Sequence, residues 1–146
     1  MTEVEFHFNV GDKLAHSCRL LKKAYATGAR IIVLAEPETL TQLDPLLWTF
    51  STTDFVPHCR SQAPAATLAA SPVLLAATLA GQTDYGVLVN LGAGVPEGFE
   101  RFERFIEVVS RDPEDVQAGR RRWKHYADRG YALKRHDLAK SVSRPQ

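Results

Sequence analysis

The 146-residue sequence contains only two cysteines, Cys18 and Cys59, and no Cys-x-x-Cys pair. Two isolated thiols argue against a disulfide framework or a cysteine zinc site and are typical of a reducing compartment. No apolar run reaches the roughly 18 residues of a membrane span, and the N-terminus lacks the basic and apolar regions of a signal peptide. We therefore expect a cytoplasmic protein with no membrane segment.

The sequence also has almost no net charge, formally +1, but its charges are unevenly distributed. Residues 1–119 hold 9 Lys and Arg against 15 Asp and Glu, a balance of −6, whereas residues 120–146 hold 9 against 2, a balance of +7. A basic C-terminal quarter on an acidic body predicts one localised site for an anionic partner. It argues against a protein that coats nucleic acid over its whole surface.

The N-terminal quarter has the pattern of strand, helix and strand. Residues 4–9 alternate apolar and polar side chains, as in a strand. Residues 14–25 carry apolar side chains at helical spacing, and Gly28 follows as a stop signal. Residues 31–34, Ile-Ile-Val-Leu, form the apolar run that is typical of a strand covered on both faces. This order predicts a βαβ unit.

The remaining chain predicts a single α/β domain over residues 1–138, with a tail over residues 139–146. We expect a mainly parallel, Rossmann-like sheet flanked by helices and without a functional nucleotide site. A helix is expected from Pro37, although Pro45 lies inside it. The other expected elements are a long loop over residues 51–72, strands over 73–77, 85–91 and 106–109, a short helix over 98–105, and a last helix capped by Asp112 that begins at Pro113 and ends at Gly130.

The glycines that follow one strand do not match a dinucleotide-binding loop. Gly92, Gly94 and Gly98 fall at i, i+2 and i+6, whereas the fingerprint requires i, i+2 and i+5 after the first strand. No Gly-x-x-x-x-Gly-Lys-Ser/Thr motif occurs. A small nucleotide-binding α/β enzyme remains the alternative to a binding module.

Catalytic and metal motifs are also missing. The five histidines show no His-x-x-x-His spacing, and no Gly-x-Ser-x-Gly elbow occurs. Glu100, Glu103 and Glu107 recur at helical spacing, which is typical of a solvated helix face. We therefore expect no catalytic residue, no cofactor and no metal.

The last helix carries the stretch Arg-Arg-Arg-Trp-Lys, residues 120–124. Arg120 and Lys124 border the stripe that we expect to face the core, with Arg121 one position round the helix. That stripe comprises Val116, Gly119, Trp123, Ala127 and Gly130. Cations beside such a groove can bind a peptide C-terminus with an aromatic last residue. Composition alone leaves three readings open: cations that offset the helix dipole, which composition favours, contacts with DNA phosphates, or an acidic peptide.

Four segments of the chain match a known pattern. They are LAHSCRLLKKAYATGARIIVLAE, LDPLLWTFSTTDFVPH, DYGVLVNL and RRRWKHYADRGYAL. Through them the chain resembles, over roughly residues 4–133, the chi subunit family of bacterial DNA polymerase III, which are accessory proteins of the clamp loader.

The resemblance implies a non-catalytic binding module without a cofactor. Members of the family bind the psi subunit of the clamp loader and the acidic C-terminal tail of single-stranded-DNA-binding protein, so that DNA is contacted only indirectly. The resemblance implies a monomer or a 1:1 heterodimer with psi. Carried over by position, the tail-binding residues are Arg120, Arg121, Trp123 and Lys124, and the psi interface comprises Trp48, Phe55 and Val56. Val116 stands where other members have a further lysine, for which Arg121 or Arg122 would compensate.

Overall fold

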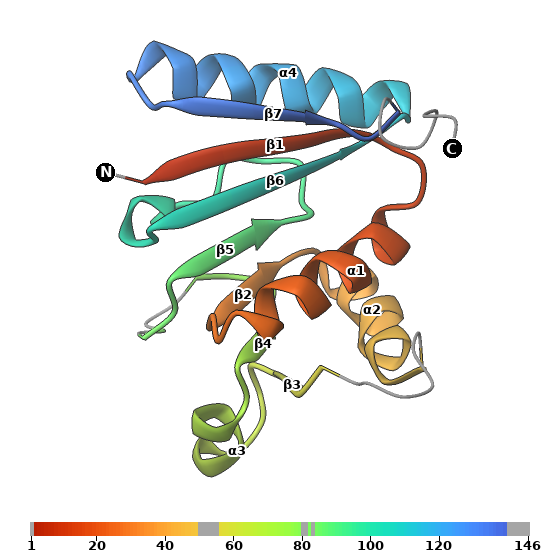
Figure 1. Ribbon diagram of the computed structural model, residues 1–146, viewed down its shortest axis with the longest axis vertical. Helices are drawn as coiled ribbons and strands as arrows, with labels where there is room; N and C mark the ends of the chain where they lie inside the picture. The colour runs from red at the N-terminus through yellow and green to blue at the C-terminus, as the bar shows by residue number, and fades with distance from the viewer. Residues whose placement is uncertain (1, 50–55, 80–81, 83, 140–146) are drawn as a thin grey trace.

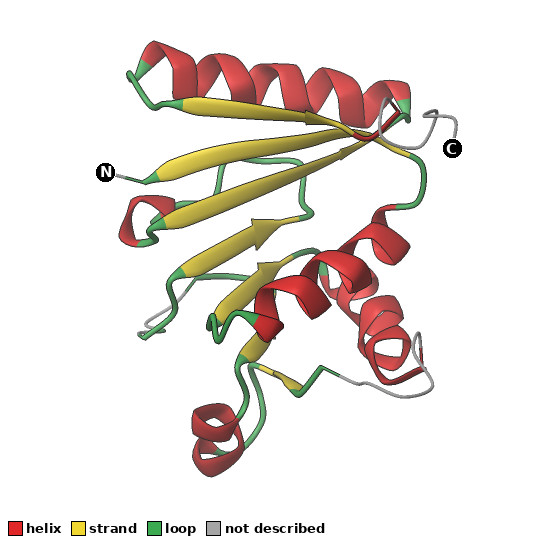
Figure 2. Ribbon diagram, in the orientation of Figure 1, coloured by secondary structure: helices red, strands yellow, loops and turns green. Residues whose placement is uncertain are grey.

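The computed structural model describes residues 2–49, 56–79, 82 and 84–139. Within these residues, seven strands form one all-parallel sheet that is flanked by four α-helices (Figures 1 and 2). The strand order across the sheet is β3-β4-β2-β5-β6-β1-β7. Along the chain the elements are β1 Glu3–Val10, α1 Lys13–Ala26, β2 Ile31–Leu34, α2 Pro37–Thr49, β3 His58–Arg60, α3 Ala65–Ala70, β4 Val73–Ala76, β5 Val87–Asn90, the short 3₁₀ helix η1 Phe99–Arg101, β6 Arg104–Ser110, α4 Pro113–Asp128 and β7 Leu133–Asp137.

Helices α1 and α2 cover one face of the sheet. Leu21 of α1 and Leu43 of α2 are fully buried against alternate residues of the central strands, such as Ile31 and Val33. Successive strand residues point to opposite faces, so the intervening Ile32 joins the second core cluster on the other side. Burial on both faces explains why the central strands are apolar along their whole length.

Helix α4 and η1 cover the opposite face, where the core is largely aromatic. Tyr126 of α4 lies against Phe99 and Phe105, with ring centroids 5.1 and 5.5 Å apart. Phe6 of β1 meets Trp123 edge-on at 5.0 Å. In Figure 1, α4 runs alongside β7 at one edge of the sheet, whereas α1 and α2 lie towards the other edge. None of the helices in the described part of the chain is both long enough and apolar enough to cross a membrane.

Most of the expected elements are confirmed, including the strands at β1, β2, β4 and β5 and the helices α1, α2 and α4. Helix α2 continues through Pro45 to Thr49. The predicted short helix over residues 98–105 is wrong beyond η1, because β6 begins at Arg104 and pairs with both β1 and β5.

Two further corrections concern short or charged segments. The predicted loop over residues 51–72 contains β3 and α3, while residues 51–55 lie outside the described part of the chain. The sequence analysis also missed β7, whose sequence Leu-Lys-Arg-His-Asp has little apolar character. Both strands form because they pair with a neighbour, β4 or β1, and not because of their own propensity. Apart from Ala139, the predicted tail over residues 139–146 also lies outside the described residues.

Candidate functional site

Helix α4 begins and ends at the expected signals. The Asp112 carboxylate accepts a hydrogen bond from the backbone N–H of Glu114, and Pro113 occupies the first helical position. The Asp115 carboxylate accepts from the backbone N–H of Ser110 at 2.7 Å and pairs with Lys13 Nζ at 3.0 Å. Burial alone would raise the pKa of Asp115, but these two contacts outweigh it and lower the pKa. The first turn is therefore tied to both β6 and α1.

The face of α4 that packs on the sheet overlaps the predicted stripe only in part. Its buried residues are Ala118, Gly119, Arg122 and Tyr126. The predicted stripe is correct for Gly119, which is buried, and for Val116 and Trp123, which are partly buried against the core. It is wrong for Ala127 and Gly130, which are exposed. Gly119 allows α4 to approach the sheet closely, because a Cβ atom there would lie 2.9 Å from Cγ2 of Val109.

Arg122 is the third arginine of the basic stretch, and it is buried in an ion pair. Its Nε donates to Oε1 of Glu107 at 2.9 Å, and the two side chains are 2% and 0% exposed. The Tyr126 hydroxyl donates to the other carboxylate oxygen of Glu107, and Asn90 Nδ2 donates to Oε1 at 3.0 Å. The predicted solvated helix face is wrong for Glu107, which lies on β6 and points into the core.

Burial raises the pKa of the Glu107 carboxyl to about 7, against the opposing effects of Arg122, Tyr126 and Asn90. Burial and the adjacent Glu107 also raise the pKa of the Tyr126 phenol. These groups form a polar connection between α4 and β6 that cannot supply a cation to a partner. Arg122 therefore stabilises the fold and is not part of a binding surface.

The same network holds the glycine-rich loop that follows β5. Arg122 Nη1 donates to the carbonyl of Ala93 at 2.8 Å, and Asn90 Nδ2 donates to that of Gly94 at 3.1 Å. The backbone N–H of Gly92 donates to Oδ1 of Asn90 at 2.9 Å. These loop groups are engaged within the protein, unlike the amides of a phosphate-binding loop, which point at the ligand.

The exposed cations of α4 lie on two different flanks. Arg120 and Lys124 are exposed on the flank of Trp123. Arg121 is two positions before Trp123, about 200° round the helix, and therefore projects from the other flank. Lys124 is paired with Asp128 at 3.1 Å, but both side chains are largely exposed and the pair is weak.

A third cation joins this flank from β7. The Arg135 guanidinium carbon lies 5.8 Å from the centre of the Trp123 ring and 5.0 Å from that of Phe8. Sequence reasoning missed Arg135 because it did not predict β7. We call Arg120, Trp123, Lys124 and Arg135 the basic–aromatic surface. A partly buried indole bordered by exposed cations can accept an apolar side chain and an anion together.

A second surface lies on α2, away from α4 (Figure 1). Trp48 is 51% exposed, and its ring centroid is 4.5 Å from that of His58. The His58 ring is itself held by Asp44, with Nε2 and Oδ1 2.8 Å apart. Leu46 is also exposed. Of the other two residues expected at the psi interface, Val56 is buried in the core and Phe55 lies outside the described residues.

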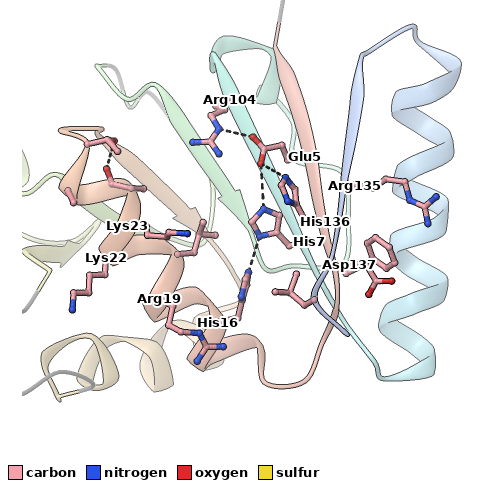
Figure 3. Close-up of a pocket in the computed structure, with 16 residues that line it drawn as sticks. Glu5, His7, His16, Arg19, Lys22, Lys23, Arg104, Arg135, His136 and Asp137 are labelled. Carbon is pink, nitrogen blue, oxygen red and sulfur yellow. Dashed lines mark hydrogen bonds and ion pairs between the residues drawn. The ribbon is translucent and has the colours of Figure 1, made fainter. Parts of the chain in front are cut away.

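An open cavity of about 1340 Å³ lies on the face of the sheet away from α4 (Figure 3). Its floor carries Glu5, His7 and His136 from β1 and β7, and basic side chains of α1 form another wall. A hydrogen bond with His7 lowers the pKa of Glu5 to about 2 against the effect of burial, with help from Arg104. Burial and the charge of His7 lower the pKa of His16 to about 4. The sequence predicts no metal site at the histidines, because none of them share a short metal-binding motif. His7, His16 and His136 come from separate elements, β1, α1 and β7, so their proximity is visible only in the folded chain.

The chain is a small parallel α/β protein. Its exposed aromatic and basic side chains lie on α2, on α4 and on the edge strand β7. The chain belongs to the family described as DNA polymerase III chi subunit, HolC, whose model matches residues 1–134. It is 29% identical over 143 residues to the DNA polymerase III subunit chi of Pseudomonas aeruginosa, which covers 94% of this chain and 98% of that relative. These matches confirm the resemblance found in the sequence and make the chain an accessory subunit of DNA polymerase III in replication.

Proposed function

We propose that this chi subunit binds the acidic C-terminal tail of single-stranded-DNA-binding protein at the basic–aromatic surface and the psi subunit at the Trp48 surface. It thereby links the clamp loader to coated single-stranded DNA without contacting the DNA itself. The observation that carries the proposal is the gathering of three exposed cations, Arg120, Lys124 and Arg135, around Trp123. As a non-catalytic module it would act as a monomer or as a 1:1 heterodimer with psi.

The charge distribution favours an acidic peptide over a DNA duplex. The body of the protein carries a balance of −6 up to residue 119, so phosphates lying across it would be repelled. A tail end requires only a local site. Its terminal carboxylate and acidic side chains would pair with the cations, while its last aromatic ring would lie against Trp123.

The expected affinity is modest. Burial of one phenylalanine side chain contributes roughly 1.5–3 kcal/mol, and each charge-assisted hydrogen bond about 1.5–3 kcal/mol. Association costs at least about 4 kcal/mol. With three such hydrogen bonds the balance is at most about −8 kcal/mol, so the dissociation constant should be micromolar or weaker. Such a contact suits a tail that is presented many times along one strand, because avidity adds to it.

The tail site is tested by titrating a labelled acidic peptide that ends in phenylalanine and following fluorescence anisotropy. Arg120→Ala combined with Lys124→Glu should weaken binding by at least about 100-fold, because two charge-assisted contacts are lost. Arg135→Ala should weaken it by about tenfold or more. The matched control is Arg121→Glu, which changes charge on the other flank of α4 and should cost at most about fivefold. Unchanged affinity in the double variant would refute the site.

The psi surface is tested separately with purified psi. Trp48→Ala should weaken association by about 30-fold or more, as expected for a central aromatic residue at an interface. Tyr25→Ala on α1 is a matched control, because it also removes an exposed aromatic side chain. Equal psi affinity of wild type and Trp48→Ala would contradict the assignment. The tail site would be unaffected by that result.

A further inference from the structure

We propose that Glu5, His7 and His136 form a binding site for a divalent transition-metal ion, zinc by preference, with the fourth coordination position open to the cavity. The site is independent of both surfaces discussed above. It lies on the opposite face of the sheet from α4, between α1 and the β7 edge, whereas the Trp48 surface lies on α2 (Figures 1 and 3).

Strand pairing brings the three side chains together. His7 of β1 and His136 of β7 are direct partners in the parallel register. Glu5 lies two residues before His7, so its side chain leaves the same face of the sheet. One ligand atom from each residue can be chosen so that all three lie within 4.8 Å of one another.

Two of the three separations between ligand atoms match a tetrahedral ion. Glu5 Oε1 lies 3.5 Å from Nε2 of His7 and 3.3 Å from Nε2 of His136. Zinc–nitrogen and zinc–oxygen bonds of about 2.0–2.2 Å at a tetrahedral angle separate neighbouring ligand atoms by about 3.3–3.6 Å. The carboxylate is therefore already at the right distance from each imidazole, while the two imidazole nitrogens, which lie within 4.8 Å of each other, would move together to about 3.3–3.6 Å on binding the ion. Two imidazoles and one carboxylate are also a known ligand set of zinc sites with an open position.

A surrounding layer of contacts orients the ligands. His7 Nδ1 lies 2.9 Å from Nε2 of the buried His16. In the tautomer with the proton on Nδ1, His7 donates to His16 and presents the lone pair of Nε2 towards Glu5. Arg104 Nε donates to Oε2 of Glu5 at 2.8 Å, which leaves Oε1 for the ion. Hydrogen bonds of this kind fix the tautomer and the orientation of metal-binding residues.

The same three groups could also form a hydrogen-bonded cluster without an ion. In that case both imidazoles would have to carry a proton on Nε2, because both approach the same carboxylate oxygen. This arrangement would place two imidazole donors and the Arg104 guanidinium around a single carboxylate. A bound ion satisfies the three ligand atoms with both imidazoles neutral, and the open cavity provides a route for the ion and a place for a water ligand.

The test is titration of the chelator-treated full chain with Zn²⁺ by calorimetry, with Co²⁺ absorption as a report on geometry. We expect one ion per chain, with the visible bands of tetrahedral Co²⁺. His136→Ala should lower the affinity by more than about 100-fold, and Glu5→Gln should do the same. His16→Ala should lower it by about 10–100-fold through the lost orientation of His7. His125→Ala, on α4 outside the cluster, is the matched control and should leave the affinity unchanged.

His136 is exposed on an edge strand, so His136→Ala is expected to fold, which circular dichroism will show. This variant therefore decides the proposal if Glu5→Gln proves unstable. Zinc binding that is equally tight in wild type and His136→Ala would overturn the proposal, as would no binding by the wild type. Loss of binding in His136→Ala but not in His125→Ala would support it.

Discussion

Replacing Arg122 by methionine tests whether the third arginine of the basic stretch serves the fold. Methionine keeps much of the aliphatic volume but leaves the Glu107 carboxylate, which is 0% exposed, without its counter-charge. Breaking a buried pair in this way costs about 3–5 kcal/mol. Since small domains have unfolding free energies of about 5–15 kcal/mol, the loss would be a large part of the total.

The cost should also depend on pH. Burial already raises the pKa of Glu107 from 4.5 to about 7, and loss of Arg122 will raise it further. The folded variant then keeps a proton that the unfolded chain releases above its ordinary pKa. Stability consequently falls as pH rises, by up to about 1.36 kcal/mol per pH unit, until the folded-state pKa is passed. The destabilisation relative to wild type should therefore be greater at about pH 8 than at about pH 5, where the acid is neutral in the fold.

The assay is urea unfolding followed by circular dichroism at both pH values. Arg121→Met is the matched control, because it removes an adjacent exposed arginine and should change the unfolding free energy by at most about 0.5 kcal/mol. A loss below about 1 kcal/mol for Arg122→Met, or an equal loss at both pH values, would refute the assignment of Arg122 to a buried ion pair.

Two further predictions concern the attachment of α4. Gly119→Ala should lower the unfolding free energy by up to about 2 kcal/mol, because overpacking against Val109 costs about 1–3 kcal/mol and the gain in helix propensity returns about 1 kcal/mol. Thermal unfolding of Gly119→Ala with and without Val109→Ala measures this clash, and strictly additive effects would contradict it. Asp115→Asn should cost about 1.5–3 kcal/mol near neutral pH. Because the folded state lowers the pKa of Asp115, this stabilisation exists above the ordinary value of 3.8 and disappears as the pH falls through the folded-state pKa. A difference between Asp115→Asn and wild type that persists in acid denaturation would show that the charge is not responsible.

The fold could be predicted well where buried segments have a recognisable apolar pattern or where a helix has a capping signal. The run at Ile31–Leu34 is apolar because β2 is covered on both faces, and α4 carries Asp112 and Pro113 at its start. In contrast, β3 and β7 owe their strand conformation to pairing with β4 and β1, and a single short segment contains no sign of such a partner. The missed strands are the two outermost ones.

The candidate sites also depend on contacts between segments that are distant in the sequence. Arg122 and Glu107 look like surface charges in the sequence, because only the folded chain shows that each neutralises the other. Because Arg122 was not expected to be buried, the predicted core-facing side of α4 was turned about the helix axis from the observed one. Arg121 was consequently expected beside Trp123. Arg135 and His136 could not be assigned to any site before β7 was known, since the two faces of that strand lead to different surfaces. Arg120 and Lys124 needed only the helix, and their predicted place on its exposed border is where the structure has them.

The strand order has a consequence for how this protein avoids unwanted association. An open sheet exposes unpaired backbone groups at both edges, where another chain could add a strand. Here one edge is β3, which is only three residues long, and the other is β7, which carries Lys134, Arg135 and His136 in succession. A short edge and a charged edge both disfavour strand addition. The two edges of the sheet therefore resist the addition of a strand from another chain, while the exposed helix faces remain accessible to partners.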